Sequence, residues 1–251
     1  MPETHQVVVI TGAGRGIGAA VARVAGAHGY AVAVNYVRDE RAAIGVVRQI
    51  ERADGRACAI QGDVSKEEDV VALFDEAARL LGPVTALVNN AGVSSPPGRL
   101  EALTAADLAR VLAINVGGTV LCAREAVRRM SRRRGGPGGG IVNISSAAAR
   151  LGGPGEWVHY AASKGAVDTF TIGLAREVAA EGIRVNAVRP GLIMTEMHAT
   201  AGDPDRPARL APTIPMARGG TGEEVAEAVL WLLSPAASYT TGAILDVAGG
   251  R

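Results

Sequence analysis

Short apolar runs rich in valine and isoleucine alternate along the chain with longer, alanine-rich segments. The apolar runs predict strands at residues 6–10, 30–35, 57–61, 85–89, 140–144, 184–188 and 243–247. The segments between them predict helices at residues 16–28, 40–53, 67–81, 104–130, 161–181 and 223–234. Several strands are apolar throughout and do not alternate with polar residues, so we expect a sheet that is buried on both faces.

The regular alternation of strand and helix predicts an α/β fold. Strand–helix–strand units build parallel sheets with right-handed crossovers. We therefore expect a doubly wound Rossmann domain with a mainly parallel seven-stranded sheet and helices on both faces. The pattern covers residues 1–251 without a linker, which predicts a single domain. Residues 192–220 interrupt it with four prolines, and a long irregular segment in a compact domain is typical of a substrate lid.

Composition mainly excludes other classes of partner. The 251 residues carry a formal net charge of +1, which favours a small molecule over nucleic acid or a membrane surface. The basic run at residues 132–140 is interpreted as a solvated helix end. The polar N-terminus predicts no signal peptide. Because no uncharged apolar run approaches the ~18 residues that a membrane helix needs, we expect a cytoplasmic protein.

Cysteine and histidine usage gives no sign of a metal or a disulfide. Cys58 and Cys122 lie in apolar stretches and are expected to be buried thiols. The four histidines, at positions 5, 28, 159 and 198, have no metal-ligand spacing, so no metal is expected.

A glycine-rich segment, TGAGRGIG, joins the first predicted strand to the first predicted helix at residues 11–18. Glycines let the backbone turn tightly and approach a phosphate, and the following helix N-terminus offers free N–H groups. This placement predicts a dinucleotide site. The TGxxxGIG spacing resembles that of the short-chain dehydrogenase/reductase family.

Further motifs of that family occur in order along the chain. They are Asp63-Val64 after the third strand, Asn89-Asn90-Ala91-Gly92 after the fourth, Asn115 in the long helix, Ser145-Ser146 after the fifth strand, the YxxxK pair Tyr160 and Lys164, and Pro190-Gly191 with Thr195 after the sixth strand. The C-terminal segment at residues 241–250 is also similar. The resemblance spans essentially the whole chain.

The resemblance implies which residues carry out the nicotinamide-dependent reaction and which bind the cofactor. The implied catalytic residues are Asn115, Ser146, Tyr160 and Lys164, with Ser145 as the alternative serine. The implied cofactor-binding residues are Gly12, Arg15, Gly16, Ile17, Gly18, Asn35, Tyr36, Arg38, Asp63, Val64, Asn89, Ala91, Gly92, Tyr160, Lys164, Pro190, Gly191, Ile193 and Thr195. Lys164 is implied to bind the nicotinamide ribose as well, and Asn115 to hold a water in a proton relay.

The chemistry needs a proton donor for the substrate oxygen. A free tyrosine has a pKa near ~10, and a nearby ammonium lowers it. Tyr160 and Lys164 are four residues apart on one predicted helix and share a face. Lys164 is one of two lysines among 26 basic residues, which indicates a position where a guanidinium does not serve. Ser146 would orient the same substrate oxygen by a hydrogen bond.

The end of the second strand bears on cofactor choice. Relatives that prefer NAD place an acidic residue there for the ribose hydroxyls, whereas this chain has Asn35 and Tyr36. Arg15 and Arg38 could bind a 2′-phosphate instead. We expect NADP to be preferred, with NAD possible, although the acidic residues at positions 39 and 40 weaken the local positive field.

These observations predict an oxidoreductase that moves a hydride between nicotinamide and a carbonyl or secondary alcohol. It resembles the 3-oxoacyl-carrier-protein reductases and the glucose 1-dehydrogenase-like members of the family. The alternative function is a non-catalytic redox sensor of the same fold. The family resemblance also implies a homotetramer built through the helices at residues 104–130 and 161–181. Trp157 and His159 either line the substrate pocket or pack the loop before Tyr160.

Overall fold

The computed structural model describes residues 6–195 and 205–251, so His5, His198 and the middle of the predicted lid lie outside the described residues. Seven strands form one sheet: β1 Val7–Ile10, β2 Ala31–Tyr36, β3 Arg56–Gln61, β4 Val84–Asn89, β5 Gly139–Ile144, β6 Ile183–Pro190 and β7 Ile244–Val247. Their order is β3-β2-β1-β4-β5-β6-β7, and every neighbouring pair is parallel. The predicted doubly wound α/β fold is confirmed.

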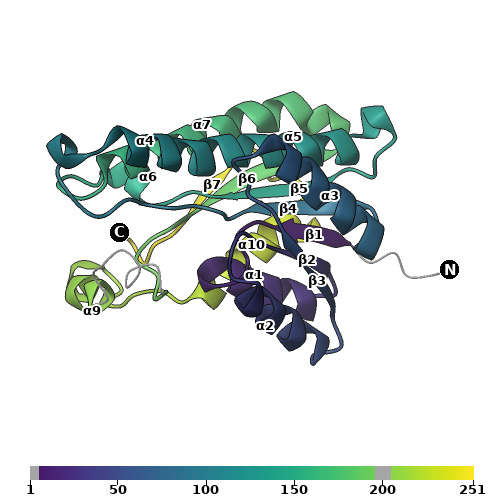
Figure 1. The fold of residues 1–251 in the computed structure, drawn as a ribbon, viewed down its shortest axis with the longest axis horizontal. Coiled ribbons are helices and arrows are strands. Elements are labelled where there is room, and N and C mark those ends of the chain that lie inside the picture. Colours follow the sequence, from purple (N-terminus) through teal and green to yellow (C-terminus); the bar gives the residue numbers. More distant parts are fainter. Residues whose placement is uncertain (1–5, 196–204) are drawn as a thin grey trace.

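Helices cover both faces of the sheet (Figure 1). One face carries α1 Gly16–Ala27, α2 Glu40–Glu51 and α10 Gly222–Leu233. The other carries α3 Glu67–Leu81, α4 Ala105–Leu112, α5 Thr119–Met130 and α7 Val158–Val178. Two short helices, α6 Ala148–Leu151 and α9 Arg206–Leu210, lie in the connections. The central strands are fully buried because each face packs on a hydrophobic layer, as their unbroken apolar sequences predict.

The strand order reverses between β1 and β4, which start their crossovers in opposite directions. In open parallel sheets, a ligand binds in the crevice at the carboxyl ends of the strands at such a switch point. The glycine-rich segment follows β1, and the Asn89–Gly92 segment follows β4. The fold therefore brings these two predicted cofactor-binding segments together.

The long helix predicted at residues 104–130 is not regular. Thr104 caps α4 as expected, because its hydroxyl accepts a hydrogen bond from the Asp107 amide at 3.0 Å. The α-helical pattern then gives way to a π-helical segment, Ala113–Gly118, before α5 begins. The prediction of one continuous α-helix was wrong at the turn that contains Asn115. Such π-bulges are rare and occur frequently at functional sites.

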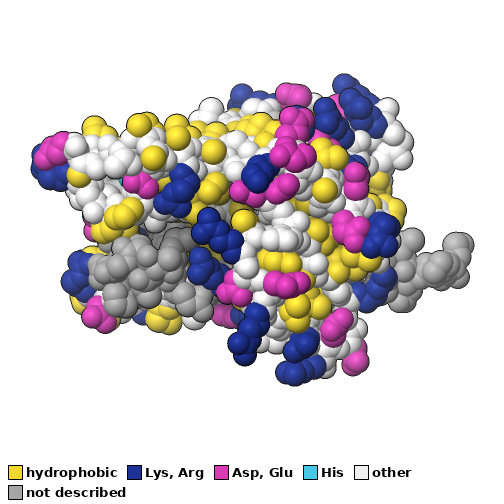
Figure 2. Space-filling model, in the orientation of Figure 1, with side chains coloured by type: hydrophobic (Ala, Val, Ile, Leu, Met, Phe, Trp, Pro, Cys, Tyr) yellow, Lys and Arg dark blue, Asp and Glu magenta, His cyan; other side chains and the backbone are white. Residues whose placement is uncertain are grey.

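The same segment is apolar over an unexpected length. Residues Ala105–Met130 form one helical rod in which an 18-residue window has a mean hydropathy of 1.4, and 28% of that window is buried. By length and composition alone this rod could cross a membrane. The sequence-based expectation of no membrane helix considered only uncharged runs, and this rod contains charged residues. Leu108, Leu112 and Val120 are exposed on it. Figure 2 shows hydrophobic side chains along this layer of helices.

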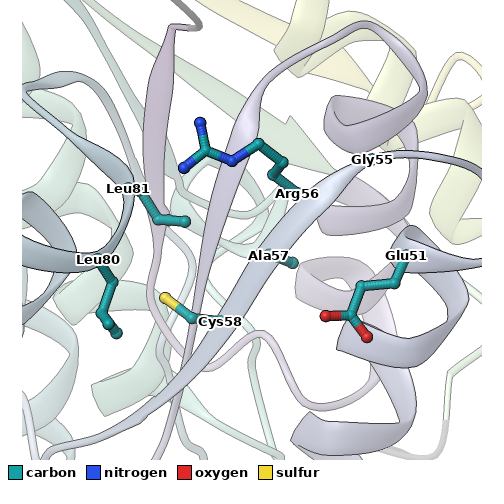
Figure 3. A pocket seen from close by; sticks show the side chains of 7 residues that line it. All are labelled: Glu51, Gly55, Arg56, Ala57, Cys58, Leu80 and Leu81. Carbon is teal, nitrogen blue, oxygen red and sulfur yellow. The ribbon is translucent and has the colours of Figure 1, made fainter.

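A shallow hollow of about 300 Å³ lies at the opposite end of the sheet from the switch point (Figure 3). Its lining includes Arg56 and Cys58 from the start of β3 and Leu81 from the end of α3. Cys122 is buried as expected, whereas Cys58 is only half-buried. Burial raises the pKa of the Cys58 thiol to about 11, so the thiol stays protonated at neutral pH. The hollow is separate from the predicted site.

Candidate active site

The glycine-rich loop has a backbone that only glycine adopts easily. Gly12 and Gly16 have φ angles of +61° and +56°. A Cβ on Gly18 would lie 2.7 Å from the carbonyl oxygen of Gly12 and closer still to the Asn90 side chain. Helix α1 begins directly after Arg15, with no side-chain cap and no acidic residue in its first turn. Its N–H groups are free for an anion, so the loop fits a dinucleotide pyrophosphate.

Thr11 and Asn90 hold this loop in place, and sequence reasoning assigned neither a role. The Thr11 hydroxyl accepts hydrogen bonds from the amides of Asn90 and Ala91, both at 3.0 Å. Asn90 Nδ2 donates to the carbonyl oxygens of Thr11 and Gly12 at 2.9 and 3.0 Å. The β1 and β4 segments are thereby locked together. Their positions inside the two motifs were the only signal in the sequence.

Asn35 supports the glycine-rich loop through hydrogen bonds of its side chain. It is fully buried, its Oδ1 accepts from the Gly12 amide at 3.1 Å, and its Nδ2 donates to the Gly62 carbonyl at 3.0 Å. The structure thus gives the Asn35 side chain a supporting role in the loop, and direct cofactor contact by this residue stays a prediction. The Asn89 side chain also points inward, where Nδ2 donates to Asn143 Oδ1 at 2.9 Å. Tyr36, next along the chain, is partly exposed.

The adenosine side of the predicted site carries positive charge. Arg15 and Arg38 are exposed, and neither forms an ion pair with a described residue. Asp39 caps helix α2 by accepting from the Ala42 amide at 2.9 Å, so its carboxylate is already engaged. A hydrogen bond from the Ser65 hydroxyl is the main cause that lowers the pKa of Asp63, and Arg38 contributes a smaller attraction. Val64 is buried beneath this edge.

The predicted acid–base pair lies in the first two turns of α7. This helix begins at Val158, three residues earlier than predicted, so Tyr160 is helical and its spacing to Lys164 is fixed. Lys164 is 4% exposed, and its Nζ donates to the Ile144 carbonyl at 2.8 Å and lies 5.8 Å from the centre of the Tyr160 ring. A Cβ on Gly92 would lie 3.4 Å from Lys164 Nζ, so the β4 segment adjoins the pair.

Burial raises the pKa of Tyr160 above its usual value, and a hydrogen bond with the Ser146 side chain opposes this. The Lys164 ammonium was expected to lower the pKa of Tyr160. The net shift is upward, because removal of the charged phenolate from water is the largest effect on this pKa. Burial also lowers the pKa of Lys164 to about 8. Tyr160 is therefore a protonated phenol, the form that can give a proton.

The two serines after β5 have different surroundings. Ser146 pairs with Tyr160, and its Oγ accepts from the Ala148 amide at 3.1 Å. Ser145 is 2% exposed, and its hydroxyl donates to the Lys164 carbonyl at 3.3 Å. Ser146 is thus the serine whose side chain lowers the pKa of the phenol, which supports it over Ser145 as the catalytic serine.

Asn115 occupies the π-helical turn and has no exposed surface. Its side chain binds the backbone of Val93 on both sides: Oδ1 accepts from the amide at 2.8 Å, and Nδ2 donates to the carbonyl at 2.9 Å. Nδ2 also donates to Ser163 Oγ at 3.0 Å. Asn115 therefore ties the loop after β4 to helix α7, beside Tyr160 and Lys164.

The loop after β4 is also fastened to the loop before Tyr160. His159 Nε2 lies 2.8 Å from Ser95 Oγ, and Trp157 Nε1 donates to the Ser95 carbonyl at 2.8 Å. Burial lowers the pKa of His159, which keeps the imidazole neutral. The contacts of Trp157 and His159 with Ser95 support the interpretation that these two residues pack the loop before Tyr160. Ser95 was missed because its partners lie more than sixty residues away.

The segment after β6, residues 191–195, lies beside the glycine-rich loop. A Cβ on Gly191 would lie 2.7 Å from Ala248 Cα, so the chain passes close to the C-terminal segment there. Ile193 is buried and pairs with Gly220, which joins the two ends of the predicted lid. Thr195 lies near Gly16, since a Cβ on that glycine would be 3.7 Å from the threonine side chain. The start of the lid thus adjoins the predicted pyrophosphate site.

Comparison with known proteins identifies this arrangement. A family model described as enoyl-(acyl carrier protein) reductase matches residues 12–251. The uncharacterized oxidoreductase YgfF of Escherichia coli (strain K12) is 54% identical over 98% of this chain and 99% of its own. The chain belongs to the short-chain dehydrogenase/reductase family. It is an oxidoreductase of that family.

One further relative and one solved structure are similar to this chain over nearly its whole length. The 3beta-hydroxysteroid dehydrogenase 1 of Eggerthella lenta is 43% identical over 98% of this chain and 93% of its own. A blue fluorescent protein from a metagenomic library, solved in complex with NADPH, superposes with a TM-score of 0.89 at 36% identity and covers 98% of this chain and 97% of its own. Enzymes of the family act between alcohols and carbonyls.

Proposed function

We propose that this protein is an NADP-dependent carbonyl reductase or secondary alcohol dehydrogenase with Tyr160 as its acid–base residue. The observation that carries the proposal is the position of the partly exposed Tyr160 and Ser146 and the buried Lys164 beside the β4 segment that holds the glycine-rich loop. The single sheet draws strands from nearly the whole described chain, which supports a single-domain enzyme. The family is typically soluble, and we propose a cytoplasmic location.

The nicotinamide, when bound, supplies or accepts the hydride. Tyr160 then gives its phenolic proton to the substrate oxygen in reduction, and takes it back in alcohol oxidation. Ser146 donates a hydrogen bond to the same oxygen and fixes its position. The Lys164 ammonium stabilises the phenolate that remains. Asn115 holds the loop and the helix that carry these groups, and we propose that it also supports the water of a proton relay.

We propose a ring-borne secondary alcohol or its ketone as the first substrate class to test, since the relative named above is a 3beta-hydroxysteroid dehydrogenase. A screen of cyclic ketones, steroids, sugars and acyl thioesters with NADPH and NADH tests the proposal. Turnover of a carbonyl substrate supports the enzyme. Tight NADPH binding without turnover of any substrate would instead favour the redox-sensor alternative.

The cofactor phosphate gives a quantitative prediction. NADPH should have the higher kcat/KM, because Arg15 and Arg38 are exposed, form no ion pair with a described residue, and are proposed to bind the 2′-phosphate. Arg38→Ala should weaken NADPH binding by about tenfold, the equivalent of ~1.4 kcal/mol, and should change NADH binding little. Isothermal titration with both cofactors measures this. Arg48→Ala is the control, since Arg48 is an exposed arginine farther along α2. A clear preference for NADH would contradict the prediction.

The exposed apolar side chains on the helical layer support a homotetramer. Leu108, Leu112, Val120 and Ile172 are exposed on α4, α5 and α7, the helices proposed to pack against their symmetry mates. Burial between copies of this chain would explain the apolar rod at Ala105–Met130 without a membrane. Light scattering at micromolar concentration should give four times the 25.6 kDa chain mass. A monomeric mass would contradict the tetramer.

A further inference from the structure

Helix α7 carries a buried carboxylate that the chemistry above does not use. Asp168 follows Lys164 by four residues, so the two side chains lie on the same face of the helix. The Asp168 side chain is only 8% exposed. A buried charge is costly unless another charge compensates it, so its surroundings call for an explanation.

Arg189 on β6 contacts only one of the two carboxylate oxygens of Asp168. Its Nε and Nη2 both approach Asp168 Oδ2, at 2.9 and 2.8 Å. Asp168 Oδ1 is buried, and no described group donates a hydrogen bond to it. Arg189 is also shared with a second acid, because its Nη1 lies 3.7 Å from Asp246 Oδ1. Asp168 is therefore not fully neutralised by its partner.

Lys164 lies next to this carboxylate and lacks a direct counter-ion. Its Nζ donates to a backbone carbonyl, that of Ile144, and no ion pair joins it to an acid in the described part of the chain. The groups around it are Tyr160 and Asp168 on its own helix, Arg189 on β6 behind Asp168, and the uncharged Asn115. Asp168 is the acid whose attraction raises the pKa of Lys164 against the effect of burial.

We propose that Asp168 is a positioning residue that keeps the Lys164 ammonium charged at the pH where the enzyme works, and that Arg189 fixes the Asp168 carboxylate in its buried position. This inference rests on the proposed function, because the charge of Lys164 affects turnover only if Tyr160 is the proton donor. An ion pair that merely fastens α7 to β6 would leave the titration of Lys164 unchanged.

The chain offers a direct readout of this charge. It contains only two lysines, Lys66 and Lys164, so protein labelled with ¹³C at the lysine ε-carbon gives two side-chain signals to follow against pH. In the wild-type protein without cofactor, the Lys164 signal should report a pKa of about 8. Asp168→Asn should lower this pKa by on the order of one pH unit, because the ammonium loses the attraction of the Asp168 carboxylate. The Lys66 signal should not change.

A matched control uses another buried acid. Glu125 on α5 is 2% exposed and accepts hydrogen bonds from Arg128 and Arg129. Glu125→Gln also removes the charge of a buried, arginine-paired acid, but on a different helix. It should destabilise the fold as Asp168→Asn does, yet leave the Lys164 titration in place. An equal shift in both variants would overturn the inference, since it would reflect general loosening.

Enzyme kinetics supply the second readout. Reduction needs the protonated Tyr160 beside a charged Lys164, so kcat/KM falls as pH rises and the pair loses a proton. Without the Asp168 charge the pair loses that proton more readily, and this alkaline limb should move to lower pH in Asp168→Asn by a similar amount. A limb at the wild-type pH, or an unchanged Lys164 titration, would overturn the inference.

A double variant and the Tyr160→Phe variant allow the result to be interpreted in every case. If Asp168→Asn does not fold, the double variant Asp168→Asn, Arg189→Met removes the stranded arginine as well and should shift the Lys164 pKa in the same direction by less. Failure of the proposed function is distinguishable, because it would appear as no turnover by the wild-type protein or as full activity in Tyr160→Phe, whereas the lysine titration needs neither substrate nor cofactor.

Discussion

Tyr160→Phe is expected to lower kcat for carbonyl reduction by about 10²–10⁴-fold, the usual contribution of a positioned proton donor. The substitution removes only the phenolic oxygen, and the ring stays packed beside Lys164. NADPH should still bind with near wild-type affinity, because the glycine-rich loop is untouched. Steady-state kinetics and fluorescence titration of NADPH measure the two quantities. Turnover at the wild-type rate would refute the assigned mechanism.

The neighbouring serines provide the control for this experiment. Ser146 pairs with the Tyr160 phenol, whereas Ser145 donates to a backbone carbonyl of α7. Ser146→Ala should therefore lose more activity than Ser145→Ala, and Ser145→Ala should mainly affect stability. The opposite order of kcat values would assign the catalytic role to Ser145.

Gly18→Ala is expected to weaken cofactor binding by roughly 10- to 100-fold, the equivalent of about 1.4–2.8 kcal/mol. The added Cβ would lie 2.7 Å from the Gly12 carbonyl oxygen and would collide with the Asn90 side chain. Asn90 and Gly12 are the groups that hold the loop against the β4 segment, so the loop must move. Calorimetric titration with NADPH measures the loss, and thermal unfolding measures any accompanying loss of stability.

Gly45→Ala is the matched control, because it makes the same chemical change in another helix. A Cβ on Gly45 would have no neighbour within 4 Å, and its φ angle is not in the left-handed region. Alanine favours a helix over glycine by about 0.5–1 kcal/mol, so this variant should be slightly more stable and bind NADPH normally. Normal NADPH affinity in Gly18→Ala would show that the loop tolerates the added carbon and would weaken its assignment as the pyrophosphate site.

Most of the fold could be predicted from the sequence because its signals are local. The strands are runs of apolar residues, and the observed strands begin and end within two residues of the predicted ones. The TGxxxGIG loop could be placed because two of its positions, Gly12 and Gly16, need positive φ angles. The Tyr160–Lys164 pair was visible because a helix brings residues four apart onto one face.

The sequence by itself thus determined the α/β class, the position of the glycine-rich loop between the first strand and the first helix, and the helical spacing of the proposed acid–base pair. Only the tertiary structure decided that Asn35 points inward to Gly12, that Ser146 pairs with Tyr160, and that Ser95 binds the loop before it. It also decided that Asp168 meets Arg189, 21 residues away on another element. The physical reason is that hydrophobic periodicity and backbone strain are properties of a short segment. A side chain's hydrogen-bond partner and burial depend on segments that only the folded sheet brings together.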